Sequence, residues 1–311
     1  MMKKNGFSRC AEMYIGRLRK EGRYSTAHVY ENALLSFRGF CGTPTVSFGQ
    51  VTREHLRCYG QYLYERGLKL NTVSTYMRRI RCVYNQAVES GEADYIPALF
   101  KKVFTGVESK RKKALSQEEM YRLMTVRVDD PKLYQAQLAL CLMFLYGGMA
   151  SVDLAHLRAS NFKEGILDYK RQKTGTQMRI EVPCAAIPMS KSLASIALSS
   201  SAYLYPFIDS MKTGEEGYKA YNAALASFNR NLKLLAEVAG VISIVTSYTV
   251  RHSFATTLKE LDVSIEMISE LLGHKSIKTT QIYLKSFSLE KMSAVNKICF
   301  ESVYNHVPKV G

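Results

Sequence analysis

The stretch LLGHKSIKTTQIYLK (residues 271–285) places Gly273 and His274 at the end of one expected helix and Tyr283 on the next. Ser264 is suited to begin the first helix, because its hydroxyl can accept a hydrogen bond from the backbone of the first turn. Gly273 is suited to end it, because glycine readily adopts the left-handed conformation found at helix C-termini. The spacing therefore predicts an imidazole fixed at a sharp corner, followed by a helix that carries a phenol.

Tyr283 is a candidate nucleophile. Positive neighbours stabilise a phenolate and lower a pKa that is ordinarily about 10. The chain holds 20 tyrosines, however, and any one of them is more often an amphipathic packing residue. The upstream stretch SYTVRHSFATT (247–257) adds Arg251 inside a largely apolar expected helix. An arginine there is a poor core residue and a good clamp for a phosphate oxygen, so the two stretches together indicate phosphate chemistry.

The composition is that of a folded, basic chain. Of its 311 residues, 47% are hydrophobic and 23% are charged, which is typical of a protein with a substantial core. Lys and Arg outnumber Asp and Glu by 43 to 27, which gives a net charge of +16. Such a surplus favours a polyanionic partner, nucleic acid before membrane, although a generally basic surface would carry the same charge. Charge alone does not choose between DNA, RNA and lipid.

The cysteines and the apolar segments argue against several classes of protein. Seven cysteines lie far apart without a C-x-x-C pair, so neither a disulfide framework nor a zinc site is indicated. No stretch approaches about 18 apolar residues, and the basic N-terminus lacks the apolar run of a signal peptide. We therefore expect a cytoplasmic protein without a metal site.

Two domains are expected: residues 1–106, then a linker over 107–114, then residues 115–311. No strand pattern interrupts the first domain, which predicts a helical bundle. The linker contains the polar, charged run VESKRKK. Ser116 and Glu119 form a capping box that begins the second domain. Helices are expected over 8–20, 25–38 (ended by Gly39), 52–67, 134–146, 187–200, 217–239, 249–260, 264–272, 277–284 and 288–304.

The second domain also carries a predicted hairpin between Ile166 and Pro183. Short β-prone runs flank the polar tip Lys173-Thr174-Gly175-Thr176, and a glycine in such a tip is typical of a hairpin turn. No other clear sheet is indicated. The expected fold class is therefore mainly α, with a helical N-terminal domain and a mixed, mostly α second domain that contains a small antiparallel β-sheet.

A further helix, expected to begin after Asn71, carries Arg78, Arg79 and Arg81 in its middle turns. These arginines lie opposite an apolar stripe, so we expect them to point away from the packed side. Arginines in that position either face water or contact phosphates, and the sequence leaves both readings open.

Taken together, these motifs resemble the tyrosine recombinase (phage integrase) family. The likeness covers most of the chain and is strongest over 247–285. It implies catalytic roles for five residues: Lys173, Tyr248, Arg251, His274 and Tyr283. Lys173 matches the hairpin lysine of the family, Arg251 its second arginine, His274 its L-G-H histidine and Tyr283 its nucleophile. Tyr248 stands at the first position of H-x-x-R, where the family usually has histidine.

The chain departs from the family pattern at the first arginine. In many members this arginine follows Gly-Met directly, and in one sub-group it precedes Gly-Met. The corresponding positions here are Ala150 and Gly147, so neither offers a guanidinium. The surrounding sequence GMASVDLAHLR matches the family pattern well. We therefore expect the catalytic domain of the family with an altered active site. Arg158, or an arginine of the N-terminal domain, is a candidate replacement.

The resemblance implies a reaction and a set of partners. Tyr283 would attack a DNA phosphodiester and form a 3′-phosphotyrosyl link, with no cofactor and no metal. The partner would be double-stranded DNA with inverted-repeat sites, gripped by a SAM-like N-terminal domain and contacted by Arg78, Arg79, Arg81 and Lys275. Rejoining would take a tetramer on DNA. The apolar stripe over 288–304 fits a helix exchanged with a neighbouring protomer, or one that packs on its own domain.

Three functions stay open. The first is a site-specific recombinase, either an integrase or excising enzyme of a mobile element or an invertase that flips a DNA segment. The second is a DNA-binding regulator or architectural protein that has lost catalysis, as the vacancy at Gly147 and Ala150 suggests. The third is a type IB topoisomerase, against which the apolar stripe of the C-terminal segment argues, because such an enzyme needs no exchange of a helix with a partner.

Overall fold

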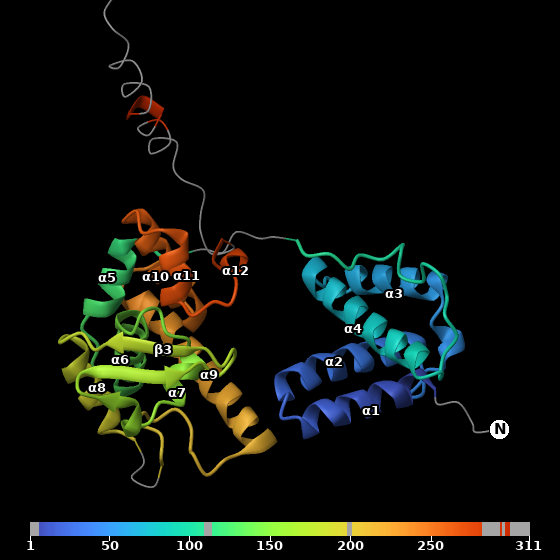
Figure 1. The fold of residues 1–311 in the computed structure, drawn as a ribbon, viewed down its shortest axis with the longest axis horizontal. Coiled ribbons are helices and arrows are strands. Elements are labelled where there is room, and N and C mark those ends of the chain that lie inside the picture. Colours follow the sequence, from blue (N-terminus) through green and yellow to red (C-terminus); the bar gives the residue numbers. More distant parts are fainter. Residues whose placement is uncertain (1–5, 109–113, 198–200, 282–292, 294–295, 299–311) are drawn as a thin grey trace, which may run out of the picture. The chain divides into compact units, whose positions relative to one another are not determined.

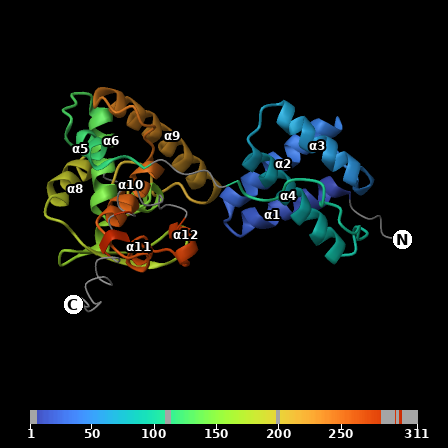
Figure 2. The same cartoon turned by 90° about the horizontal axis from the view of Figure 1, so that it is seen from above.

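The computed structural model describes residues 6–108, 114–197, 201–281, 293 and 296–298 (Figures 1 and 2). Contacts divide the chain into two compact units. One comprises residues 1–110 with 211–220, and the other 111–210 with 221–311. Within the described part of the chain, no helix combines the length and the apolar character needed to cross a bilayer.

The described residues of the first unit form four complete α-helices, a short 3₁₀ turn and the beginning of helix α9 (Gly214–Val238). Helix α2 packs against α1, α3 and α4, and their apolar faces enclose one core of buried aromatic and aliphatic side chains. Phe7, Phe37 and Tyr59 lie at its centre with almost no exposed surface, and their rings meet edge to face. The bounds are α1 Phe7–Lys20, α2 Tyr24–Cys41, η1 Phe48–Gln50, α3 Arg53–Glu65 and α4 Leu70–Glu89.

The prediction that Gly39 ends the second helix is wrong. Helix α2 continues through Gly39 to Cys41, and Gly42 provides the left-handed end with a φ of 64°. A glycine inside a helix costs about 1 kcal/mol relative to alanine. Here the extra turn places Phe40 against the core, where its ring lies 5.2 Å from that of Tyr59. The partial burial of Phe40 offsets the cost, and this contact could not be inferred from local sequence.

The second unit surrounds the central helix α6. All residues from Ala136 to Met143 are buried, and α6 contacts α5, α7, α8 and α10. It begins at Pro131 rather than at residue 134, because Asp130 accepts hydrogen bonds from two backbone N–H groups of its first turn. The helix bounds are α5 Gln117–Thr125, α6 Pro131–Leu145, α7 Ser151–Ala155, η2 Ala159–Asn161, α8 Ala186–Ala194, α9 Gly214–Val238, α10 Ser247–Glu260, α11 Ile265–Leu271 and α12 Ile277–Gln281.

The predicted hairpin is present as strands β2 (Ile166–Lys170) and β3 (Gln177–Glu181). The Arg171 N–H donates to the Thr176 carbonyl at 2.9 Å and so closes the loop between the strands. Gly175 in that loop has a φ of 67°, which glycine adopts without strain. A two-residue strand, β1 (Phe162–Lys163), adds a third antiparallel member that the sequence did not indicate. The predicted mainly α fold with a small antiparallel sheet is confirmed.

Local capping signals in the second unit also agree with the structure. Ser116 and Glu119 form the predicted capping box at the start of α5. Ser264 accepts a hydrogen bond from the Met267 N–H at the start of α11, and Gly273 follows that helix with a φ of 60°. Both views show α11 close to the hairpin (Figures 1 and 2). The predicted helix over 288–304 lies mostly outside the described residues.

Candidate active site

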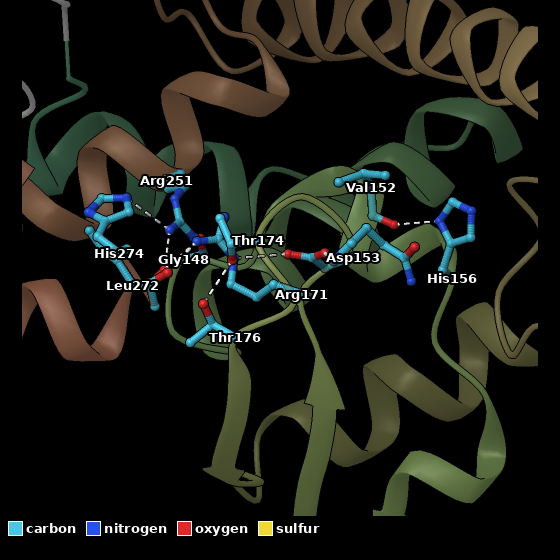
Figure 3. Close-up of polar contacts among 12 residues, drawn as sticks. Gly148, Val152, Asp153, His156, Arg171, Thr174, Thr176, Arg251, Leu272 and His274 are labelled. Atoms are coloured by element: carbon cyan, nitrogen blue, oxygen red, sulfur yellow. Dashed lines mark hydrogen bonds and ion pairs between the residues drawn. The ribbon is translucent and has the colours of Figure 1, made fainter. Parts of the chain in front are cut away.

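Helix α10 places Arg251 in a buried position, with 4% of its surface exposed. Its Nη1 donates a hydrogen bond of 2.8 Å to the Gly148 carbonyl, and its Nη2 donates to the Leu272 carbonyl. The same Nη2 lies 3.2 Å from His274 Nε2 (Figure 3). The arginine of one predicted motif and the histidine of the other therefore meet in one site, although 23 positions separate them.

His274 is held at the corner that the sequence predicts. Its backbone N–H donates to the Ser269 carbonyl at 2.9 Å, and its Nδ1 lies 2.8 Å from the buried Thr280 hydroxyl. Burial, together with the positive charges of Arg251, Arg171 and Lys173, lowers the pKa of His274 to about 4. The ring is therefore neutral at pH 7.

The hydrogen-bond network assigns the tautomer of this neutral ring. Arg251 can only donate, so Nε2 of His274 is the acceptor of that contact. The proton must then lie on Nδ1, which donates to the Thr280 hydroxyl. His274 is thus oriented from both sides, by a charged donor and by a buried acceptor.

Arg171 is a part of the site that the sequence did not single out. It follows strand β2, has 7% of its surface exposed, and reaches the turn after α11. Its Nη1 donates to the carbonyls of Leu272 at 3.0 Å and Gly273 at 2.8 Å. Because Arg251 also donates to Leu272, two buried guanidinium groups meet at one carbonyl oxygen (Figure 3).

Asp153 on helix α7 anchors this second guanidinium. The carboxylate is 2% exposed, and its Oδ2 lies 3.4 Å from Nε of Arg171. Its Oδ1 accepts the Gln172 N–H at 2.7 Å, which fixes the first residues of the hairpin loop. Two signals could have identified this pair: the acidic residue inside the GMASVDL frame, and an arginine two positions before the hairpin lysine Lys173.

The other residues predicted for this site, the catalytic candidates Lys173, Tyr248 and Tyr283 and the DNA-binding candidate Lys275, differ in their surroundings. Lys173 is exposed in the hairpin loop and close enough to His274 to lower the pKa of that ring. Lys275 is exposed directly after His274. Tyr248 lies in the first turn of α10, 46% exposed, with its ring edge-on to His252 at 4.4 Å between centroids. Tyr283 lies outside the described residues.

The positions of the missing first arginine are part of a tight turn. Gly147 and Gly148 both have left-handed backbones, with φ of 69° and 67°, where a side chain would be strained. A Cβ atom on Gly148 would also lie 2.8 Å from the ring of Phe254. Ala150 is the N-cap residue of α7, the short helix that carries Asp153.

Arg158, the candidate replacement, is engaged elsewhere. Its guanidinium lies over the Tyr203 ring, 5.4 Å from the centroid. Tyr203 packs edge-on against His156, which Figure 3 shows at the opposite end of the view from Arg251 and His274. The structure therefore does not bring Arg158 into the site.

The sequence led us to expect that the three arginines of α4 point away from the packed side. In the structure, not all of them do. Each is half-buried. The Arg79 guanidinium lies over the Tyr30 ring of α2, 5.0 Å from the centroid. Arg81 Nη1 donates to the Thr105 hydroxyl at 3.3 Å, and Arg78 Nε donates to the backbone of its own helix. Their contact with DNA stays a prediction.

Positive charge dominates the site in the second unit. Two guanidinium groups are buried there, a lysine ammonium is close by, and Asp153 offers one carboxylate. Attraction for an anion is strong in such a place, because little water screens it. Among the residues that the structure describes, no three His, Cys, Asp or Glu side chains are grouped to hold a metal ion. The arrangement is suited to hold a phosphate and stabilise charge on its oxygens.

Known proteins share both the sequence pattern and the fold. The phage integrase SAM-like domain matches residues 6–103, and the phage integrase family matches residues 113–290. Tyrosine recombinase XerA of Pyrococcus furiosus is 31% identical over 188 residues, which are 60% of this chain and 61% of that protein. Tyrosine recombinase XerD of Rhizobium meliloti is 26% identical over 277 residues, 83% of this chain and 84% of that one. The chain thus spans less than two thirds of the Pyrococcus relative.

A solved structure extends the likeness to the fold. A lambda integrase tetramer bound to a Holliday junction is similar with a TM-score of 0.65 and 16% identity, covering 88% of this chain and 77% of that one. The family match spans residues 113–290, more than half of the chain, and includes the paired Arg251 and His274. The chain therefore belongs to the phage integrase family, the tyrosine recombinases.

Proposed function

We propose that the protein is a site-specific DNA recombinase that cuts and rejoins DNA through a 3′-phosphotyrosyl intermediate on Tyr283. The observation that carries the proposal is the meeting of Arg251 and His274, 3.2 Å apart, at a buried and positively charged turn. These are the residue types and the motifs by which the family holds a phosphate. The relatives XerA and XerD, both named tyrosine recombinases, support the same activity for this chain.

The proposed reaction exchanges one phosphoester for another. The Tyr283 oxygen attacks the phosphorus of a DNA phosphodiester and its proton leaves to water, while the bond from phosphorus to the 5′ oxygen breaks. Lys173 gives a proton to that departing oxygen. In the second step, a 5′ hydroxyl from another strand attacks the phosphotyrosine, releases Tyr283 and restores a phosphodiester. Because the number of phosphoester bonds is conserved, no nucleotide hydrolysis is needed.

Arg251 and His274 would stabilise the negative charge that grows on the non-bridging oxygens. Arg251 is already oriented by the Gly148 and Leu272 carbonyls, so little reorganisation is needed when a phosphate arrives. The neutral His274 would respond to the same phosphate, because a nearby negative charge raises a lowered pKa. A proton taken up at Nε2 would make the imidazole a second charged donor.

The proposal extends to the DNA and to the assembly. Arg78, Arg79, Arg81 and Lys275 would contact phosphates of a duplex with inverted-repeat sites. Rejoining between two duplexes calls for a tetramer, the state in which the lambda integrase neighbour was solved on a Holliday junction. The segment 288–304 would link the protomers, and the reaction would take place in the cytoplasm. Integration, excision and inversion all use this chemistry.

A second candidate is a DNA-binding regulator that has lost catalysis. The observation in its favour is the turn at Gly147 and Gly148, whose left-handed backbone accompanies the loss of an arginine at positions 147 and 150. Loss of one charged donor typically slows such a reaction by a factor on the order of 10² or more.

A covalent trap separates the two candidates. Nicked duplexes tiled across the DNA on both sides of the gene would be incubated with the full chain, so that loss of the short fragment beyond the nick makes cleavage irreversible. The recombinase should form an adduct that resists denaturant and is absent with Tyr283→Phe. An adduct that persists with Tyr283→Phe would reject this nucleophile. Sequence-specific binding without any adduct would favour the regulator.

A further inference from the structure

We propose that Arg171 supplies the guanidinium that positions 147 and 150 lack, by contacting the phosphate under attack, and that Asp153 positions it. This assignment rests on the proposed recombinase function. It makes Arg171 a catalytic residue of the same site as Arg251, and it makes Asp153 a positioning residue that acts through Arg171.

The first argument is proximity. Arg171 Nη1 donates to the Leu272 carbonyl at 3.0 Å, and Arg251 Nη2 donates to the same oxygen. Two donors on one acceptor lie within about 6 Å of each other, since each hydrogen bond is about 3 Å long. The oxygens of a tetrahedral phosphate lie closer together than this, and each accepts from a donor about 3 Å away, so donors about 6 Å apart can reach one phosphate. One phosphate can therefore be contacted by both guanidinium groups, as two arginines in a phosphate clamp require.

The second argument is charge. Arg171 and Arg251 are 7% and 4% exposed, and two cations in so buried a place repel each other unless anions compensate them. Asp153 compensates in part. Burial raises the pKa of the adjacent Tyr169 phenol, which therefore stays neutral, and His274 is neutral as well. Among the described residues, this pair of guanidinium groups meets one carboxylate, that of Asp153, which favours the binding of a further anion.

The third argument is orientation. Asp153 binds Nε of Arg171, and the two turn carbonyls bind Nη1, which leaves Nη2 directed to neither anchor. The Gln172 N–H in turn fixes the Asp153 carboxylate at 2.7 Å. A rigid guanidinium that is held at both Nε and Nη1 keeps the donors of Nη2 aligned for a ligand.

The fourth argument is that the fold makes room for this side chain. A Cβ atom on Gly273 would lie 2.8 Å from Cδ of Arg171, so the glycine of the L-G-H motif leaves the path of Arg171 open. Through its Nε, Arg171 meets Asp153 of helix α7, which begins just after Ala150. The hairpin thus places the Arg171 guanidinium beside helix α7, which directly follows positions 147 and 150, where the arginine is missing.

A substrate with a neutral linkage tests the assignment. A methylphosphonate at the cleaved position replaces one charged non-bridging oxygen by a methyl group, so there is less charge for Arg171 to neutralise. Arg171→Gln should lower the single-turnover rate of adduct formation by about 100-fold or more on ordinary DNA and by less than about 10-fold on the methylphosphonate. Arg251→Gln serves as a positive control with the same pattern.

Arg179→Gln is the matched control. Arg179 lies on strand β3 of the same hairpin, has a side chain 72% exposed and pairs with Asp168, so its loss should leave both rates roughly unchanged. Asp153→Asn should lower the rate of adduct formation on ordinary DNA more than on the methylphosphonate, but by a smaller factor than Arg171→Gln. Asp153→Glu should keep more of the rate on ordinary DNA than Asp153→Asn. Thermal unfolding of each variant establishes that it folds. If Arg171→Gln does not fold, Arg171→Lys, which keeps the charge, takes its place in the test.

The outcomes separate the two proposals. Equal losses on both substrates would mean that Arg171 only supports the turn at Gly273, and would overturn the assignment while leaving the recombinase intact. Unchanged cleavage by Arg171→Gln would do the same. A wild-type protein that forms no adduct on any tiled duplex would overturn the recombinase function itself, and the assignment with it.

Discussion

Arg251 donates a hydrogen bond to His274, with its Nη2 3.2 Å from the imidazole Nε2. Burial opposes protonation of the ring and lowers its pKa, and the charged donor at this nitrogen adds to the effect. In the free protein, the His274 ring is therefore neutral, and its Nε2 accepts a hydrogen bond from Arg251. The state of this imidazole is the most direct physical report on whether a phosphate has entered.

We predict that His274 titrates with a pKa of about 4 in the free protein and with a higher pKa when DNA is bound. The shift follows because a phosphate supplies negative charge beside a ring that positive neighbours now surround. Nuclear magnetic resonance of the imidazole carbon signals, assigned with His274→Gln, would give both values. A free-protein pKa close to the ordinary value of 6.5 would contradict the burial and the positive surroundings described for this ring.

The same shift makes stability depend on pH with a definite sign. The folded pKa lies below the unfolded value, so the unfolded chain binds more protons between about pH 6.5 and about pH 4. The contribution of neutral His274 is fully present above that window and is lost as the pH falls through it. Urea unfolding should show a smaller loss of stability from pH 7 to pH 5 in His274→Gln than in the wild type. An equal loss in both proteins would show that His274 is not the titrating group.

Much of the fold follows from local signals in the sequence. Ser264 and Gly273 bound their helix as expected, and Gly175 marks the hairpin loop, because caps and tight turns depend on a few adjacent residues. The end of α2 was misplaced at Gly39, because packing of Phe40 against a distant helix decides it. Local rules predict where a turn can occur, and tertiary burial decides which glycine is used.

The site was predictable in part for the same reason. Arg251 and His274 belong to motifs that can be read along the chain. Arg171 has only its position two residues before Lys173 as a signal, because its place in the site rests on a hydrogen bond to Gly273, 102 positions away. Its partner Asp153 lies in a different element again. A residue whose role comes from such contacts looks, in sequence, like any exposed arginine beside a hairpin.

Thr280→Val should disturb His274 without touching the cations of the site. The Thr280 hydroxyl is buried and accepts the Nδ1 proton of His274 at 2.8 Å. Valine keeps the shape and removes the acceptor, which should cost about 1 kcal/mol of unfolding free energy and raise the mobility of the ring. The neighbouring Thr279 is exposed, so Thr279→Val is the control and should change stability little. Equal effects of the two substitutions would argue that Thr280 does not hold the ring.

Gly273→Ala should be more damaging than the same change at Gly175, although both glycines have left-handed backbones with φ of 60° and 67°. The backbone strain is shared and costs about 1 to 2 kcal/mol in each case. At Gly175 a Cβ would meet no atom within 4 Å, whereas at Gly273 it would lie 2.5 Å from Sδ of Met178 and 2.8 Å from Cδ of Arg171. Overpacking of this kind costs a further ~1–3 kcal/mol.

The difference between these two variants isolates the packing of Arg171 against the turn. Chemical unfolding of both should show that additional loss only for Gly273→Ala, and the variant should also displace the Gly273 carbonyl that Arg171 binds. The signals of the Arg171 Nε–H group should therefore shift or broaden in Gly273→Ala and stay in place in Gly175→Ala. If the two variants lose the same stability and leave that signal alone, the close approach of Arg171 to the L-G-H turn is not what requires a glycine there.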